Sequence, residues 1–258
     1  MNSLSELASF IGAAAWLPQI FAWGYKVFIR ASLTVYPAAF AEIGYSSLGP
    51  ICNIRMALDV KNRDLIINKM RLEINHDESG ARSFQWVGIN QALSQITDAI
   101  GNRQVVSRDQ VPTALRVQEN SILEVFVRFQ ELKFIEACAE VDAQLLNQFS
   151  YLRETRPEDF PALTIKTKEF HDAVKKRKDH FWWREGSYSV TLLVESSRKF
   201  KYRGYSACFS LSRFDVEKLR QNIVMVGIAA ENVIMSNSKE FKLKPETWQW
   251  VNATITSR

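Results

Sequence analysis

The chain has 258 residues and a net charge of +5, and 47% of its residues are hydrophobic. This composition excludes a disordered chain, which is poor in apolar residues, and a content of only 10 Gly and 7 Pro excludes a collagen-like or low-complexity fibre. The length suffices for one large domain with a core of its own. The positive charge is concentrated in residues 155–258, which carry 19 Lys and Arg against 12 Asp and Glu.

The chain begins with an apolar stretch from residue 4 to residue 28, in which Glu6 and Lys26 are the only ionisable residues. As a helix this stretch extends for about 37 Å, which is enough to cross a hydrocarbon layer of roughly 30 Å. Aromatic rings and cations toward its end are typical of a membrane interface. The sequence therefore predicts a membrane-associated hydrophobic helix over residues 1–30. The expected anchor residues are Trp16, Leu17, Ile20, Phe21, Trp23, Lys26 and Arg30.

Two alternatives to a spanning helix stay open. Pro18 removes a backbone hydrogen bond, and polar residues fall loosely on one side of the helix, so the stretch could lie flat in the interface. It could also pack on the protein's own core. If it spans, Lys26 and Arg30 favour a cytoplasmic location for the rest of the chain.

Beyond residue 30, apolar and polar residues alternate with a period of two, which is typical of strands with one buried face. The predicted strands cover residues 33–36, 40–45, 51–60, 66–74, 82–88, 113–118 and 122–129. In the fourth of them, Ile66 is expected on the same face as Met70 and Leu72, with Ile67 on the other. Residues 89–110 stay unassigned, because residues 92–100 could form a short helix while residues 101–109 have the composition of a loop.

Apolar residues then recur at steps of three and four from Phe134 to Leu152, which predicts an amphipathic helix of about 20 residues. A second helix is expected over residues 166–178. The remaining elements are strands over residues 188–195 and 205–211, a short helix over residues 214–225 capped by Ser212 or Asp215, and a last strand near Trp248 and Trp250.

Strands that occur in runs argue against a parallel sheet with alternating helices. The pattern favours a mainly β (α+β) fold. We expect an antiparallel immunoglobulin-like or jelly-roll-like β-sandwich with helical insertions, carried on the N-terminal apolar helix. No long linker divides residues 31–258, which we expect to form a single domain.

The sequence contains no recognisable catalytic motif. A phosphate-binding loop, a GxSxG elbow and an HExxH helix are all missing. Cys138 falls on the apolar face of a predicted helix, where a thiol is buried and inert. His76 opens a polar turn and is expected in solvent, while His171 and His180 face opposite sides of one helix. We therefore expect a non-enzymatic protein with neither a cofactor nor a metal.

A basic and aromatic patch in the last third is the candidate binding site. Its predicted residues are Lys175, Lys176, Arg177, Lys178, Trp182, Arg198, Lys199, Lys201 and Arg203. Such a patch suits anionic lipid headgroups or the phosphates and bases of nucleic acid. In the alternative interpretation, the neighbouring aromatic side chains belong to the core and the cations only cover the outer face. Those side chains are Phe181, Trp183, Phe200 and Tyr202.

These observations lead to two functional hypotheses. The first is a membrane-tethered, non-enzymatic binding or scaffold module on the cytosolic side, with membrane lipids or a membrane-proximal protein as its partner. The second is a soluble protein that binds nucleic acid or a nucleotide, in which the N-terminal helix is only a packing element.

Overall fold

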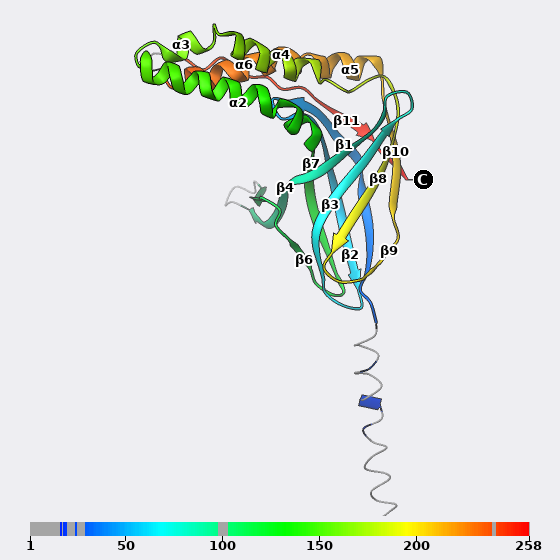
Figure 1. Ribbon diagram of the computed structural model, residues 1–258. Helices are drawn as coiled ribbons and strands as arrows, with labels where there is room; N and C mark the ends of the chain where they lie inside the picture. The colour runs from blue at the N-terminus through cyan, green and yellow to red at the C-terminus, as the bar shows by residue number, and fades with distance from the viewer. Residues whose placement is uncertain are drawn as a thin grey trace, which may run out of the picture.

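The computed structural model describes residues 29–97, 103–238 and 241–257, together with Trp16, Pro18, Gln19 and Gly24. The described part is mainly β, with one curled sheet and a group of helices across one of its ends (Figure 1). The strands are β1 (Ser32–Ser46), β2 (Gly49–Lys61), β3 (Leu65–His76), β4 (Gly80–Thr97), β5 (Arg103–Gln110), β6 (Leu115–Val117), β7 (Ser121–Glu131), β8 (Gly186–Ser196), β9 (Lys201–Tyr202), β10 (Tyr205–Leu211), β11 (Trp250–Thr254) and β12 (Thr256–Ser257).

The strands lie in the order β11-β1-β2-β7-β4-β3-β8-β10-β12, with β5 on β4, β6 on β3 and β9 on β1. Among these strands β1 and β9 pair in parallel and the other pairs are antiparallel. For β1–β2 and β3–β4 the antiparallel pairing follows from short connections, because a tight turn can join only antiparallel neighbours.

The two edges of the sheet are joined through the C-terminal segment. Strand β11 pairs with β1 at one edge, and β12 pairs with β10 at the other. Only Ile255 separates β11 from β12, and its backbone N–H donates to the Ala39 carbonyl at 2.7 Å. In addition β9, which lies between β8 and β10 in the chain, pairs with β1. The sheet therefore curls around one interior and leaves few unpaired edge groups in the described part.

The expected immunoglobulin-like or jelly-roll-like sandwich is not confirmed. A sandwich has two separate sheets, whereas all described strands here belong to one sheet. The physical reason is the pairing of the chain's last strands with both edges, which the alternation of apolar residues cannot reveal. The broader expectation of a mainly β fold is confirmed.

One cluster of buried side chains fills the interior, with members from Ala31 to Ala253. Tyr188 and Phe209 stack at 4.8 Å between ring centroids. Trp183 is fully buried, and its indole N–H donates to the Gly44 carbonyl at 2.8 Å. This bond satisfies the one polar group of a large apolar side chain, so the ring can occupy the core without an unpaired donor.

The predicted faces of β3 are reversed at its start. Ile67 is fully buried and Ile66 is 45% exposed, the opposite of the expectation. The pairing of β3 with β8 shifts register between Ile67 and Lys69, while Met70 and Leu72 point inward as predicted. A bulge inserts one extra residue and so exchanges the two faces of a strand, which a regular period of two cannot anticipate.

Two other segments also differ from the sequence analysis. Residues 33–36 and 40–45 belong to one strand, β1, whose pairing with β2 is irregular between Pro37 and Ala41. Proline lacks the N–H that a regular ladder requires, which explains the apparent break. In the part of residues 89–110 that the structure describes, β4 continues to Thr97 and β5 covers Arg103–Gln110, so these residues are strands and not the helix and loop that the sequence suggested.

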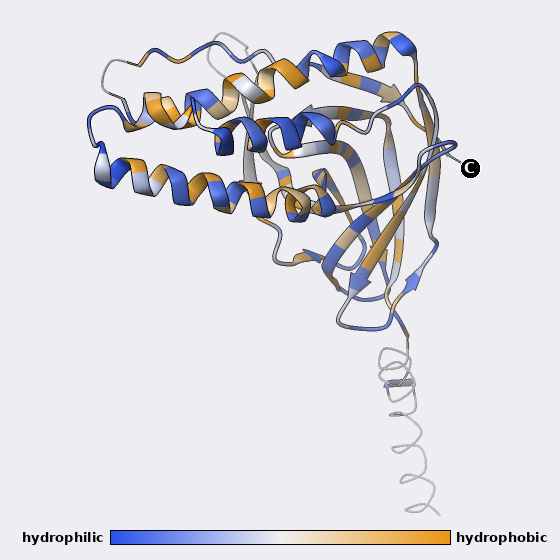
Figure 2. Cartoon of the chain, turned by 45° about the horizontal axis from the view of Figure 1, so that its top comes forward, coloured by the Kyte–Doolittle hydropathy of each residue, from blue (hydrophilic) through white to orange (hydrophobic). Residues whose placement is uncertain are grey.

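The helices are α2 (Leu132–Thr155), α3 (Phe160–Thr164), α4 (Lys168–Asp179), α5 (Arg213–Arg220) and α6 (Asn222–Met235). The predictions of α2 and α4 are confirmed. The predicted cap is also correct, because Ser212 and Asp215 form a reciprocal capping box at the start of α5. Strongly apolar segments of α6 are visible among the helices in Figure 2. The sequence analysis ended this helical region at residue 225 and therefore missed most of α6.

We expect Gly44→Ala to lower the free energy of unfolding by about 1–3 kcal/mol, because overpacking displaces neighbouring groups. A Cβ atom at Gly44 would overlap the ring of Trp250, its partner on β11. Denaturant unfolding measures the change. Gly204→Ala is the matched control, since its Cβ would meet no atom within 4 Å. Equal stability of the two variants would contradict the packing of β11 on β1.

Burial raises the pKa of Tyr188 and of Tyr205 to about 12, above the value of about 10 for the unfolded chain. The folded state therefore keeps protons that the unfolded state releases. This contribution to stability is complete below about pH 10 and is lost as the pH rises through 12. We expect the denaturation midpoint to fall over this interval, and less steeply in Tyr188→Phe. Tyrosinate absorbance that develops without any change in stability would oppose this account.

Candidate functional site

The predicted basic patch is divided between the two ends of the sheet. Strand β1 starts beside the predicted cations of the β8–β10 connection, where Ser32 pairs with Lys201. It ends beside the predicted cations of α4, where the Tyr45 hydroxyl donates a hydrogen bond to the Arg177 carbonyl. About 40 Å of extended chain separates the two positions. The cations of α4 and those of the β8–β10 connection therefore do not form one surface (Figure 1).

Two of the four predicted cations of α4, Arg177 and Lys175, are engaged with the protein itself. The Arg177 guanidinium donates to Asp142 at 2.7 Å and to the backbone carbonyls of Ala173 and Ser47. Lys175 pairs with Asp179 one helical turn away at 3.0 Å. Arg177 thus connects α4 to α2 and to the β1–β2 turn, which is a structural role.

Trp182 belongs to the core and not to the binding surface. Its side chain is 4% exposed, and the Arg82 guanidinium covers its ring at 5.0 Å. This placement corrects the predicted contact role, because a buried ring cannot stack on a ligand. The alternative interpretation is confirmed for Trp183, which is fully buried. Phe181, Phe200 and Tyr202 are partly buried and pack against the same core.

The other end of the sheet is strongly basic. We call it the basic end and define it as residues 29–32, 61–64, 115–119 and 196–204. It contains eight Lys or Arg residues and two acidic residues, a net charge of +6, while the whole chain carries +5. The cations are Arg30, Lys61, Arg63, Arg116, Arg198, Lys199, Lys201 and Arg203. The remainder of the chain therefore has a net charge of −1, and the excess of positive charge is confined to this end.

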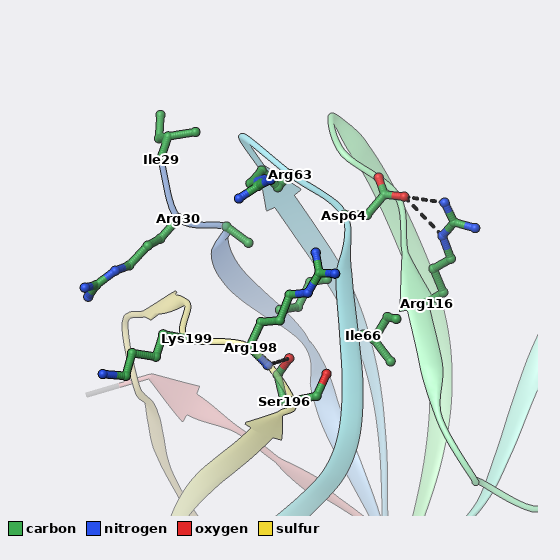
Figure 3. Close-up of a pocket in the computed structure, with 12 residues that line it drawn as sticks. Ile29, Arg30, Arg63, Asp64, Ile66, Arg116, Ser196, Arg198 and Lys199 are labelled. Carbon is green, nitrogen blue, oxygen red and sulfur yellow. Dashed lines mark hydrogen bonds and ion pairs between the residues drawn. The ribbon is translucent and has the colours of Figure 1, made fainter. Parts of the chain in front are cut away.

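A cavity of about 500 Å³ opens in the basic end. Its walls come from the start of β1, the β2–β3 turn, β6 and the β8–β9 loop (Figure 3). Buried Ala31 and Leu65 supply apolar surface, and Ser196 and Ser197 supply hydroxyl groups. The charged lining residues are Arg30, Arg63, Asp64, Arg116, Arg198 and Lys199. The volume falls in the range of roughly 300–1,000 Å³ that small-molecule sites occupy.

Asp64 is the acidic member of this lining, and it is already neutralised. Its carboxylate accepts from Arg116 Nε at 3.1 Å and Nη2 at 2.5 Å, and from the Glu119 backbone N–H at 2.9 Å. The hydrogen bonds from Arg116, more than any other influence, lower the pKa of the Asp64 carboxyl. Within the described part of the chain, no carboxylate lies at ion-pair distance from Arg30, Arg198 or Lys199. Within the described residues, no carboxylate therefore neutralises these three cations.

Sequence reasoning missed Arg63 and Arg116 as site residues and assigned Arg30 only to the membrane anchor. None of the three belongs to a run of cations as dense as Lys175–Lys178. Arg63 lies between the strands predicted over residues 51–60 and 66–74, whereas Arg116 lies inside the strand predicted over residues 113–118. What brings the three together is the common end at which their strands start or finish, a property of the topology.

His76 is buried, which corrects the expected solvent exposure of this residue. It is 1% exposed, and its Nδ1 accepts from the backbone N–H groups of Glu78 and Ser79. The Ser79 hydroxyl lies 2.9 Å from the same nitrogen, and Asp77 lies 3.2 Å from Nε2. A serine, a histidine and an aspartate thus meet in one turn. The Nδ1 lone pair is already shared by two amides, so the imidazole closes the β3–β4 turn and does not activate Ser79.

Cys138 is buried as predicted, and desolvation by that burial raises the pKa of its thiol. A thiol in this state is a poor nucleophile. Among the residues that the structure describes, no three His, Cys, Asp or Glu side chains converge in a way that could hold a metal ion.

Most of the predicted membrane anchor cannot be placed. Leu17, Ile20, Phe21, Trp23 and Lys26 lie outside the described residues. Trp16 is 63% exposed, and Arg30 lines the cavity at the basic end. No described helix combines the length and apolar character that crossing a membrane requires.

Comparison with models of known protein families, with curated proteins and with solved structures found no match.

Arg177→Ala should lower the free energy of unfolding by about 1–3 kcal/mol, since it removes charge-assisted hydrogen bonds that join three elements. Lys175→Ala should change it by no more than about 0.5 kcal/mol, because an exposed ion pair within a helix contributes little. Thermal and denaturant unfolding of both variants measure the difference. Equal effects would mean that Arg177 has no structural role.

Proposed function

We propose that this protein is a non-enzymatic, membrane-associated binding or scaffold module whose basic end faces the cytosolic surface of a bilayer. The main observation behind the proposal is that the apolar stretch and the basic end are adjacent in the chain. Residue 29 follows the apolar stretch of residues 4–28 directly, and it lies in the basic end. A hydrophobic segment that enters lipid at this point holds the basic end beside the headgroups.

Charge supports this orientation. Anionic lipids of the cytosolic leaflet attract Lys and Arg at about 1 kcal/mol per residue near the surface. The basic end has a net charge of +6, whereas the remainder of the chain has −1. The electrostatic attraction therefore acts on one end of the molecule only and orients it on the membrane.

Exposed aliphatic side chains support the same orientation. Ile66 lines the cavity of the basic end and is 45% exposed, and Ile122, next to the first residue of β7, is 68% exposed. Apolar side chains beside cations favour a membrane interface, where one part contacts acyl chains and the other contacts headgroups.

The opposite, helical end is suited to display. In the part of the chain that the structure describes, its exposed apolar side chains include Leu146 on α2, Phe214 on α5, and Val224 and Val233 on α6. Contiguous apolar patches are a common feature of surfaces that bind other proteins, and α5 and α6, which carry three of these four side chains, pack against each other. A membrane-proximal protein partner at this end is consistent with a scaffold role.

The second hypothesis, a soluble protein that binds nucleic acid or a nucleotide, stays a prediction with less support. Recognition of single strands relies on exposed rings that stack on bases. In the described basic end the aromatic residues are Phe200 and Tyr202, and both are partly buried against the core. The Tyr202 hydroxyl is moreover bonded to the Leu192 carbonyl at 2.9 Å. The surface therefore fits phosphates better than bases.

We expect the full-length chain to remain in the membrane pellet after washing with alkaline carbonate, because lipid solvates its apolar stretch. The triple variant Leu17→Glu, Ile20→Glu and Phe21→Glu should move to the supernatant, since charges inside a bilayer are costly. The control carries the same three charges at exposed positions of the helical end, namely Leu146→Glu, Val224→Glu and Val233→Glu, and should stay in the pellet. Recovery of the unaltered chain in the supernatant would refute the proposal.

A further inference from the structure

We infer that the cavity in the basic end is a binding site for the phosphomonoester groups of a multiply phosphorylated small molecule, such as a phosphorylated headgroup. The inference rests on the proposed function, because it assigns a ligand class to the surface that faces the membrane. It adds to that function a cavity that selects its ligand. Diffuse attraction to a charged bilayer needs no cavity, whereas a cavity selects a ligand by shape and by the number of its phosphates.

The lining of the cavity carries an excess of positive charge. Five cations and one acid line the cavity, and the acid, Asp64, is occupied by Arg116 and by the Glu119 amide. Arg30, Arg198 and Lys199 have no carboxylate partner within the described residues. A concentration of uncompensated positive charge is unfavourable without an anion, so the lining favours a ligand that carries several negative charges.

Most of the cations that line the cavity are arginines. Arginine presents a planar fork of donors that matches two oxygens of a phosphate, and its charge does not depend on pH in the physiological range. Three of the cations, Arg30, Arg63 and Arg198, are arginines that come from three different segments. Each phosphomonoester carries a charge of about −1.5 to −2 at neutral pH, so two such groups balance the net charge of the lining.

The cations Arg30 and Lys199 and the bonded pair of Asp64 and Arg116 lie on different sides of the cavity (Figure 3). In Figure 3, Arg30 and Lys199 extend to the same side of the cavity, while the bonded pair of Asp64 and Arg116 lies on the other side. The Ser196 hydroxyl accepts from the Arg198 backbone N–H at 3.3 Å, which constrains the loop that carries Arg198 and Lys199. This hydrogen bond limits the conformations of the loop backbone, which reduces the entropy that the backbone loses when a ligand binds.

The neighbouring cations supply an internal control. Lys201 and Arg203 belong to the same basic end and follow Lys199 closely in the chain, but they do not line the cavity. Replacing either pair removes two positive charges from the same end. The two double variants therefore have the same net charge and differ only in whether the lost groups line the cavity.

We would measure the binding of soluble inositol 1,4,5-trisphosphate to the full-length chain in neutral detergent by calorimetry. The expected result is saturable binding that weakens by about tenfold or more in Arg198→Gln with Lys199→Gln, since charge-assisted bonds are lost. In Lys201→Gln with Arg203→Gln the loss should stay within about threefold, as expected for screened charges outside the site. Matching thermal midpoints ensure that all three proteins are folded.

Equal losses in the two double variants would overturn the inference, because they would show diffuse electrostatics and no cavity-specific site. Failure of the unaltered chain to bind the trisphosphate would also overturn the inference. These results do not depend on a bilayer, so a failure here differs from a failure of the carbonate test. If carbonate releases the chain and the chain still binds the trisphosphate, the binding site is supported and the membrane tether is refuted.

A second arm identifies the source of the phosphate groups. The chain reconstituted in vesicles is titrated with soluble trisphosphate, in membranes that contain either phosphatidylinositol bisphosphate or phosphatidylserine at equal total charge. If the bisphosphate lipid alone reduces the apparent affinity for the trisphosphate, it competes for the cavity and the ligand is a lipid headgroup. Equal affinities in both membranes assign the site to a soluble phosphorylated ligand.

Discussion

Hydrogen bonds from residues 250–257 to both edges of the sheet are the constraint on which the other features depend. Strand β11 completes the edge at β1, and β12 completes the edge at β10. A sheet with free edges would present rows of unsatisfied backbone groups and would need other devices to avoid pairing with a neighbour. Here the same pairing also encloses the core, because every inward side chain of the curled sheet meets others across one interior.

A sheet that is closed in this way has two ends, and the protein gives them different chemistry. At one end the helices pack over the strands and bring α4 against the β1–β2 turn through Arg177. At the other end, away from helices α2 to α6, cations from four separate segments surround a cavity (Figure 1). Long strands such as β1 keep the two ends apart, so a ligand at one end and a partner at the other do not compete for space.

The sequence predicted most of the strands and helices because each has a regular apolar period, as in α2 and β10. It failed where the period is broken, at the bulge in β3 that exchanges Ile66 and Ile67, and where topology decides, at the closure of the sheet. The candidate site shows the same division. Arg198 and Lys199 were predicted from a run of charge, whereas Arg63 and Arg116 join them only because their strands share an end. Trp182 was misplaced because a ring next to cations has the same sequence pattern whether it is buried or exposed.

The position of the closing strands in the chain has a consequence for biosynthesis. Since β11 and β12 follow every other described element, the growing chain can form β1, β10 and all strands between them while both edges are still unpaired. Unpaired edges and a core open on one side favour association between nascent chains, as in other proteins with many non-local contacts. Pairing of β11 and β12 with the two edges is the step that ends this vulnerability, and a molecular chaperone would be needed most before it.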